Sequence, residues 1–217
     1  MDLNNYPYLR YVGKKNAPIV LSTGMSTMEE VKKAVETIEE VGNSQICLLH
    51  CISIYPPDLN TIHLNNIIGL RDLFPNYPIG FSDHSIGCEI ANAATALGAV
   101  LIEKHLTLDH KKIGMDNQMA MEPGDLKNLV RGCNNIYEAM GHKERVLMEA
   151  EIEQKKKMRR SIIAARDLKA GTVISADDLD AKRPGTGIAP SRMDSLIGKT
   201  LTRDVAFDEV FKEEDFE

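Results

Sequence analysis

The sequence predicts an α/β fold in its longer first part, followed by a small second domain that is rich in short strands and turns. Short apolar runs recur between residues 18 and 105, with helix-like segments between them. The runs are continuously apolar instead of alternating with polar residues, which is typical of parallel strands buried on both faces of a sheet. Near Met158 the composition changes to shorter apolar runs separated by turn residues. These observations predict about four βα units before the second domain.

The first βα unit carries the clearest local signals. Residues 18–22 form an apolar run that ends in a turn, and Ser26 with Glu29 has the spacing of a capping box that starts a helix. Gly42 supplies a stop signal after that helix. One apolar stripe at three- and four-residue spacing indicates its buried face: Met28, Val31, Val35, Ile38 and Val41.

The remaining elements follow from the same patterns. Further strands of the sheet are predicted at residues 46–50, 78–82 and 99–103. Their helices are predicted at residues 64–74, 87–97 and 125–140, the last two ending at Gly98 and Gly141. Strands of the second domain are predicted at residues 161–165, 169–174 and 183–188. The predicted boundaries are 1–141 for the βα part, 142–157 for a charged linker and 158–217 for the second domain.

Composition excludes several classes of protein. The 217 residues carry a formal net charge of −6, and the basic run Lys155–Arg160 is better explained as a solvated linker than as a nucleic-acid contact. We expect no membrane partner, because no stretch is apolar enough to cross a bilayer, and no secretion signal is visible. The four cysteines lack the spacing of a zinc or disulfide framework, so a cytoplasmic protein with reduced thiols is expected.

Polar side chains gather where the predicted strands end. The carboxyl ends of parallel strands meet at one edge of the sheet, which is where βα proteins place their reactive groups. His84 and His105 follow neighbouring strands and can converge on one point. Neutral imidazoles in such a place suit a divalent transition metal, although plain hydrogen-bonded histidines remain the alternative.

Other polar residues have weaker cases. Ser53 and Ser82 can donate to a phosphate or simply cap loops, and Asp116 can bind a sugar hydroxyl or serve a turn. Arg183 can reach a ligand or only decorate a turn. Three charged residues complete the strand ends: Asp83 can orient a neighbour or cap a helix, while Glu103 and Lys104 can pair with each other.

Several strings in this order make a family resemblance visible. Leu48-Leu49-His50-Cys51 with Tyr55-Pro56, Gly80-Phe81-Ser82-Asp83-His84 and Ile102-Glu103-Lys104-His105-Leu106-Thr107 resemble the sialic acid synthase family. The strings Asp167-Leu168-Lys169-Ala170-Gly171 and Lys182-Arg183-Pro184-Gly185-Thr186-Gly187-Ile188 resemble its C-terminal antifreeze-like (SAF) domain. The resemblance implies the C-terminal half of a (β/α)8 TIM-type barrel, about four βα units, followed by a small β-rich SAF domain.

The resemblance also implies a function. Members of this family are N-acetylneuraminate-type synthases, which condense phosphoenolpyruvate with an N-acylmannosamine-type sugar into a nine-carbon 2-keto sugar acid and phosphate. They use a divalent metal, Mn²⁺ or Mg²⁺, and His84 and His105 match its two histidine ligands. Ser82 matches a serine near the phosphate, and Tyr55 and Asp116 match residues beside the sugar. Arg183 matches an arginine that reaches the partner's active site in a domain-swapped homodimer.

The sequence also departs from the family. Ser53 stands where many members have Asn or Thr, and Met115 and Asn117 replace a Pro and a His of the sugar loop. Residues 2–9 resemble the segment after the family's phosphate-binding motif, so we expect the lysines for phosphoenolpyruvate to belong to an N-terminal half that is either separately encoded or lost. We expect the chain alone to be inactive for lack of that half. The alternative is a truncated, non-catalytic subunit that binds sugar phosphates or forms oligomers. The sugar itself stays open between N-acetylmannosamine and the precursors of legionaminic or pseudaminic acid.

Overall fold

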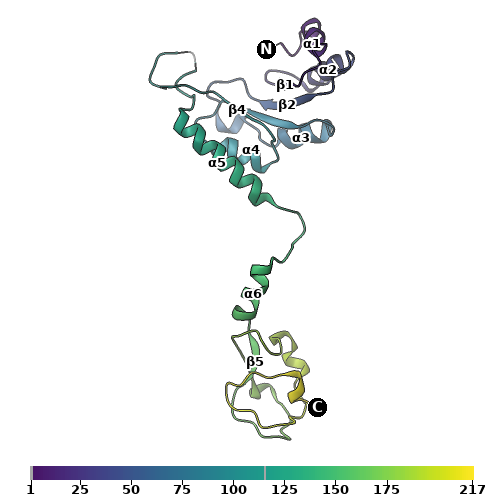
Figure 1. Ribbon diagram of the computed structural model, residues 1–217, viewed down its shortest axis with the longest axis vertical. Helices are drawn as coiled ribbons and strands as arrows, with labels where there is room; N and C mark the ends of the chain where they lie inside the picture. The colour runs from purple at the N-terminus through teal and green to yellow at the C-terminus, as the bar shows by residue number, and fades with distance from the viewer. Residues whose placement is uncertain (1, 115) are drawn as a thin grey trace. The chain divides into compact units, whose positions relative to one another are not determined.

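The computed structural model describes residues 2–114 and 116–217 and divides the chain into two compact units, Met1–His142 and Lys143–Glu217 (Figure 1). Met115, one of the two departures in the sugar loop, lies outside the described residues. No helix within the described ranges is long and apolar enough to cross a membrane.

The first unit contains the predicted parallel sheet, which is confirmed. Its strands are β1 (Ile19–Ser22), β2 (Ile46–Cys51), β3 (Ile79–Asp83) and β4 (Ile102–Lys104), in the order β1-β2-β3-β4. All three pairings are parallel. The last strand begins at Ile102, later than residue 99, where we predicted it. The amide of Ala99 still donates back to Ala94 of the preceding helix, and Val100 forms a bend although its amide already donates to Ile79. The register places Cys51 beside Ser82, and Asp83 beside Lys104.

Over the part of this unit that the structure describes, five helices accompany the sheet: α1 (Tyr6–Gly13), α2 (Met28–Glu39), α3 (Asn66–Leu73), α4 (Glu89–Ala96) and α5 (Pro123–Met140). A 3-10 turn, η1 (Leu59–Thr61), lies before α3. Helix α1 was not predicted. The stop signals hold, since Gly98 and Gly141 have φ of +96° and +54° and so occupy a conformation that other residues adopt at a cost.

The capping box of α2 lies one residue later than predicted. Thr27, in an extended conformation, accepts a hydrogen bond from the amide of Glu30, whose carboxylate accepts from the amide of Thr27 at 2.8 Å. Ser26 is not the cap, because its hydroxyl donates to the carbonyl of Gly24. The core beneath these helices is built from side chains of helices and sheet together, among them Val31, Ile38, Leu48, Ile67 and Phe81. Burial of this apolar surface fixes the sheet and therefore the place where its strands end.

The second unit has less regular structure than predicted. It contains α6 (Glu149–Met158), an antiparallel pair β5 (Ser161–Ala164) and β6 (Leu179–Lys182), and three 3-10 turns, η2 (Ala176–Asp178), η3 (Pro190–Ser195) and η4 (Glu213–Asp215). The strands predicted at 169–174 and 183–188 were wrong. Gly171 has φ of +82° and turns the chain, so the first segment makes only an isolated bridge at Val173. The second contains Pro184, Gly185 and Gly187, which cannot sustain a ladder.

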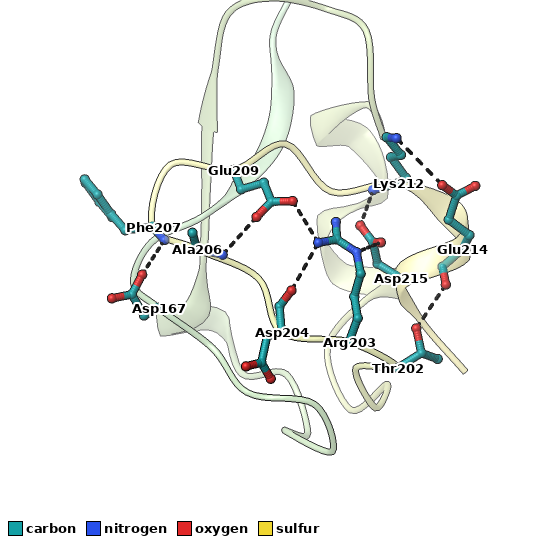
Figure 2. A network of polar contacts seen from close by, with 10 residues as sticks. All are labelled: Asp167, Thr202, Arg203, Asp204, Ala206, Phe207, Glu209, Lys212, Glu214 and Asp215. Atoms are coloured by element: carbon teal, nitrogen blue, oxygen red, sulfur yellow. Dashed lines mark hydrogen bonds and ion pairs between the residues drawn. The ribbon is translucent and has the colours of Figure 1, made fainter.

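An arginine centre ties the end of the second unit to its core (Figure 2). Arg203 donates from Nε to Asp215 Oδ1 at 2.6 Å and from a terminal nitrogen to Glu209 at 2.8 Å. Asp215 also accepts from the amide of Lys212, so one buried carboxylate holds both η4 and Arg203. These hydrogen bonds, with the two carboxylates, raise the pKa of Arg203 above its usual value.

Candidate functional site

Three aromatic side chains meet beyond the carboxyl ends of the strands. The ring centroids of Tyr55 and His84 lie 4.2 Å apart, those of His84 and His105 5.2 Å, and those of Tyr55 and His105 5.7 Å. His84 follows β3 directly and His105 follows β4, so the parallel pairing of these strands brings the two histidines together. The structure thus has the convergence that the spacing predicted.

A hydrogen bond to the backbone orients His84. Its Nδ1 atom lies 2.8 Å from the carbonyl oxygen of Ile52, and because a carbonyl only accepts, Nδ1 carries the proton. In the neutral ring this leaves Nε2 as the acceptor, the form in which histidine binds metals. Burial lowers the pKa of His84, but the hydrogen bonds to Cys51 and Ile52 and the nearby charges of Cys51 and Asp83 raise it by more.

Asp116 lies beside His105 and faces the same space as Tyr55. Its Oδ2 atom is 3.7 Å from Nδ1 of His105, and both side chains are about one third exposed, 34% and 35%. A small cavity of about 130 Å³ is lined by Tyr55, Pro56, Ile86, Asp116, Gln118 and Met119. A polar group that enters this cavity can therefore contact a phenol and a carboxylate at once.

The two serines have different surroundings. The Ser82 hydroxyl donates to Glu103 Oε1 at 2.6 Å and is buried. Ser53 Oγ lies 3.7 Å from the sulfur of Cys51. Neither serine is therefore an isolated donor. A hydroxyl has only one proton to donate, so Ser82 can donate to a phosphate only if its hydrogen bond to Glu103 is broken.

Cys51 is a polar centre that the sequence reasoning missed. Burial raises the pKa of its thiol, but the contacts with His84, Ser22, Ser53 and Ser82 together lower it by more. The resulting pKa of Cys51 is about 7, below the usual value for a thiol. His50, its neighbour, points elsewhere: it stacks on Phe81 and its Nε2 lies 2.6 Å from the carbonyl of Ile62. The available signal was the last position of β2, since that is where parallel strands deliver polar groups.

A buried ion pair joins the two residues that immediately precede the histidines in the sequence. Lys104 Nζ is 2.7 Å from Asp83 Oδ2, and the two side chains are only 3% and 0% exposed. The pair between Glu103 and Lys104 that the sequence allows does not form. Successive residues of a strand point to opposite faces, so Glu103 meets Ser82 while Lys104 meets Asp83, each across the β3–β4 register.

The site fits a divalent cation through two imidazoles. Among the residues that the structure describes, no group of three or more His, Cys, Asp or Glu side chains is placed to hold a metal ion. His84 and His105 would therefore supply two ligands to such an ion, and water, substrate or further protein would have to supply the rest. Arg183 belongs to the second unit, where its Nε donates to the carbonyl of Met158 at 3.2 Å.

Comparison with known proteins assigns the two parts of the chain to known families. Residues 1–145 match the NeuB family and residues 159–217 match the SAF domain. The chain is similar to the N,N'-diacetyllegionaminic acid synthase of Legionella pneumophila, with 37% identity over 94% of this chain and 58% of that protein. It is 35% identical to the human N-acetylneuraminate-9-phosphate synthase, over 98% of this chain and 59% of that protein.

A solved structure agrees with these matches. The spore coat polysaccharide biosynthesis protein spsE of Bacillus subtilis aligns with 32% identity and a TM-score of 0.61 over 100% of this chain and 65% of its own length. The chain thus spans less than two thirds of the relatives that it matches. The α/β fold with its parallel sheet, the order of the two units and the family matches lead to one conclusion: the chain belongs to the NeuB family and carries a SAF domain.

Proposed function

We propose that the strand ends of the first unit form the metal- and sugar-binding half of a synthase active site. The reaction condenses phosphoenolpyruvate with an N-acylmannosamine-type sugar and yields a nine-carbon 2-keto sugar acid and phosphate. The observation that carries this proposal is the meeting of His84, His105 and Tyr55 beside Asp116. The names of the two synthase relatives support this class of product.

His84 and His105 would hold the divalent cation, Mn²⁺ or Mg²⁺. Imidazole ligands favour Mn²⁺, because Mg²⁺ prefers oxygen. When bound, such an ion supplies Lewis-acid polarisation of the sugar carbonyl. The carbonyl of Ile52 contributes by holding the proton of His84 on Nδ1, so that Nε2 is the ligand atom.

The remaining side chains would bind the substrates. Tyr55 packs against the sugar, and Asp116 accepts hydrogen bonds from its hydroxyls in the cavity that both residues line. Ser53 and Ser82 donate to the phosphate. For this, the Ser82 hydroxyl turns from Glu103, to which it donates in the free site, toward the phosphate. Arg183 acts on the acylamino group of sugar bound to a partner subunit, in a domain-swapped homodimer.

Further βα units would complete the site, either from the same polypeptide or from a separate one. Within the described residues, β1 and β4 each pair on one side only, as the two ends of half a (β/α)8 barrel would. The relatives are also longer than this chain. The added half would supply the cationic side chains that phosphoenolpyruvate needs, so the 217-residue chain by itself is expected to be inactive.

The test is release of inorganic phosphate from phosphoenolpyruvate with Mn²⁺ and N-acetylmannosamine. The chain is assayed alone and with a co-expressed N-terminal half taken from the Legionella relative. Phosphate release only with the added half supports the proposal, and replacing the sugar with the legionaminic or pseudaminic precursor identifies the substrate. Sugar binding without turnover, when a folded N-terminal half is present, would instead establish a non-catalytic subunit.

A further inference from the structure

One lysine joins the two strand ends that carry the histidines. Lys104 is the last residue of β4 and immediately precedes His105, while Asp83 is the last residue of β3 and immediately precedes His84. Asp83 and Lys104 are partners in the parallel register. The pair therefore lies one residue before both histidines, on adjacent strands.

Lys104 contacts the two residues that flank His84 in the sequence, Asp83 and Ser85. Its ammonium donates to Asp83 Oδ2 at 2.7 Å and also to the carbonyl oxygen of Ser85. The other carboxylate oxygen, Asp83 Oδ1, accepts from the amide of Ser85 at 2.8 Å. The residues before and after His84 are thus bonded to one ammonium, and that ammonium belongs to the neighbour of His105.

The ion pair does not take part in the site directly. Lys104 lines a cavity between β4, α4 and α5, together with Thr95, Leu126 and Leu129. Ser82 and Glu103, two residues before the histidines, meet each other across the same register. Because side chains alternate along extended strands, Asp83 and Lys104 point to the helix-covered side and the histidines to the other.

Burial makes this connection rigid. The side chains of Lys104 and Asp83 are 3% and 0% exposed, so water neither screens nor replaces their contact. By contrast, Lys33 on α2 is an exposed lysine whose pairs with Glu36 and Glu40 are 3.5 and 3.7 Å long. Two strand ends held by a buried pair keep a fixed separation, whereas exposed pairs exchange with water.

We propose that Asp83 and Lys104 are positioning residues that set the separation of His84 and His105 and thereby the affinity of the site for a divalent cation. The inference rests on the proposed metal-binding function of the two histidines. Groups that orient metal ligands without touching the metal change affinity by about 10- to 100-fold when they are removed. We expect a loss in that range when the pair is removed.

The experiment compares four variants of the full chain: Lys104→Met, Asp83→Asn, the double variant, and Lys33→Met as the matched control. Mn²⁺ affinity is measured from the electron paramagnetic resonance signal of free Mn²⁺, and thermal stability by circular dichroism in EDTA. Each single variant leaves one charge buried without its partner and loses stability. The double variant leaves neither charge, so its melting temperature returns toward wild type.

The double variant decides between positioning and simple stabilisation. Melting close to wild type with Mn²⁺ affinity still about 10- to 100-fold weaker supports the proposal. Wild-type affinity in the double variant, or an equal loss in Lys33→Met, overturns it.

A separate readout covers failure of the proposed function itself. If the wild-type chain binds no Mn²⁺, the metal site is wrong, but ¹⁵N–¹H spectra of labelled imidazoles still report the geometry. A single Nδ1–H tautomer of His84 in wild type that becomes averaged in the double variant supports positioning. Identical spectra in the two proteins overturn it.

Discussion

The Nδ1 atom of His84 lies 2.8 Å from the carbonyl oxygen of Ile52, and this contact decides which nitrogen of the ring can bind a cation. Ile52 follows β2 and His84 follows β3, so the contact crosses between neighbouring strand ends. The tautomer of His84 therefore depends on the pairing of β2 with β3, because the accepting carbonyl belongs to the residue that follows β2.

Replacing either histidine should abolish most of the metal affinity. We expect His84→Gln and His105→Gln each to weaken Mn²⁺ binding at least about tenfold, since each removes one of two imidazole ligands. The measurement is equilibrium titration with Mn²⁺. His110→Gln is the control, because Nδ1 of His110 contacts Oε1 of Glu122 at 3.0 Å and His110 is not one of the two proposed ligands. Unchanged binding in both site variants would falsify the metal site.

The thiol of Cys51 should ionise near neutral pH. The pKa of Cys51 is lowered to about 7, so its thiolate forms as the pH rises through that value, below the usual range for a thiol. We expect the 240 nm absorbance difference between wild type and Cys51→Ser to show a midpoint there. His84→Gln should move the midpoint upward, because His84 is the neighbour that lowers the pKa of Cys51 most. A midpoint near 9 in wild type contradicts this account.

Removing the guanidinium at the centre of Figure 2 should destabilise the second unit. Asp215 is 1% exposed, so Arg203→Met leaves a buried carboxylate without its cation, which costs about 3 kcal/mol. Lys169→Met is the matched control: its pair with Asp204 is 83% and 58% exposed, so water screens the two charges and removing the pair should have a much smaller effect. Native-state hydrogen exchange across residues 159–217 measures both. Equal effects would show that burial of Asp215 is not what matters.

Gly80 should not tolerate a side chain. A Cβ there would lie 2.6 Å from the carbonyl oxygen of Leu101 and 2.5 Å from a methyl of Leu49, so β3 and β4 would have to separate. We expect Gly80→Ala to lower the free energy of unfolding by about 1–3 kcal/mol. Gly69 in α3 has open space around its Cβ position, so Gly69→Ala should be stabilising by about 0.5–1 kcal/mol. Denaturant unfolding of the two variants tests the contrast, which a similar response at both positions would refute.

Local patterns in the sequence were sufficient for most of the first unit. Apolar runs gave the strands, three- and four-residue spacing gave α2, and Gly98 and Gly141 ended the later helices. They were insufficient in the second unit, where Gly171 and Pro184 interrupt the predicted strands and β6 forms instead at Leu179–Lys182. Short segments there are held by isolated bridges and by the Arg203 centre, which single-segment patterns do not encode.

At the site, the sequence by itself determined that His84 and His105 follow adjacent strands of a parallel sheet, because that depends only on the order of apolar runs along the chain. Only the tertiary structure decided which partners the polar residues take. Glu103 and Lys104 are neighbours in sequence, yet one meets Ser82 and the other Asp83. The physical reason is the alternation of side chains across a strand combined with a register that the buried core fixes, which brings together residues 21 positions apart.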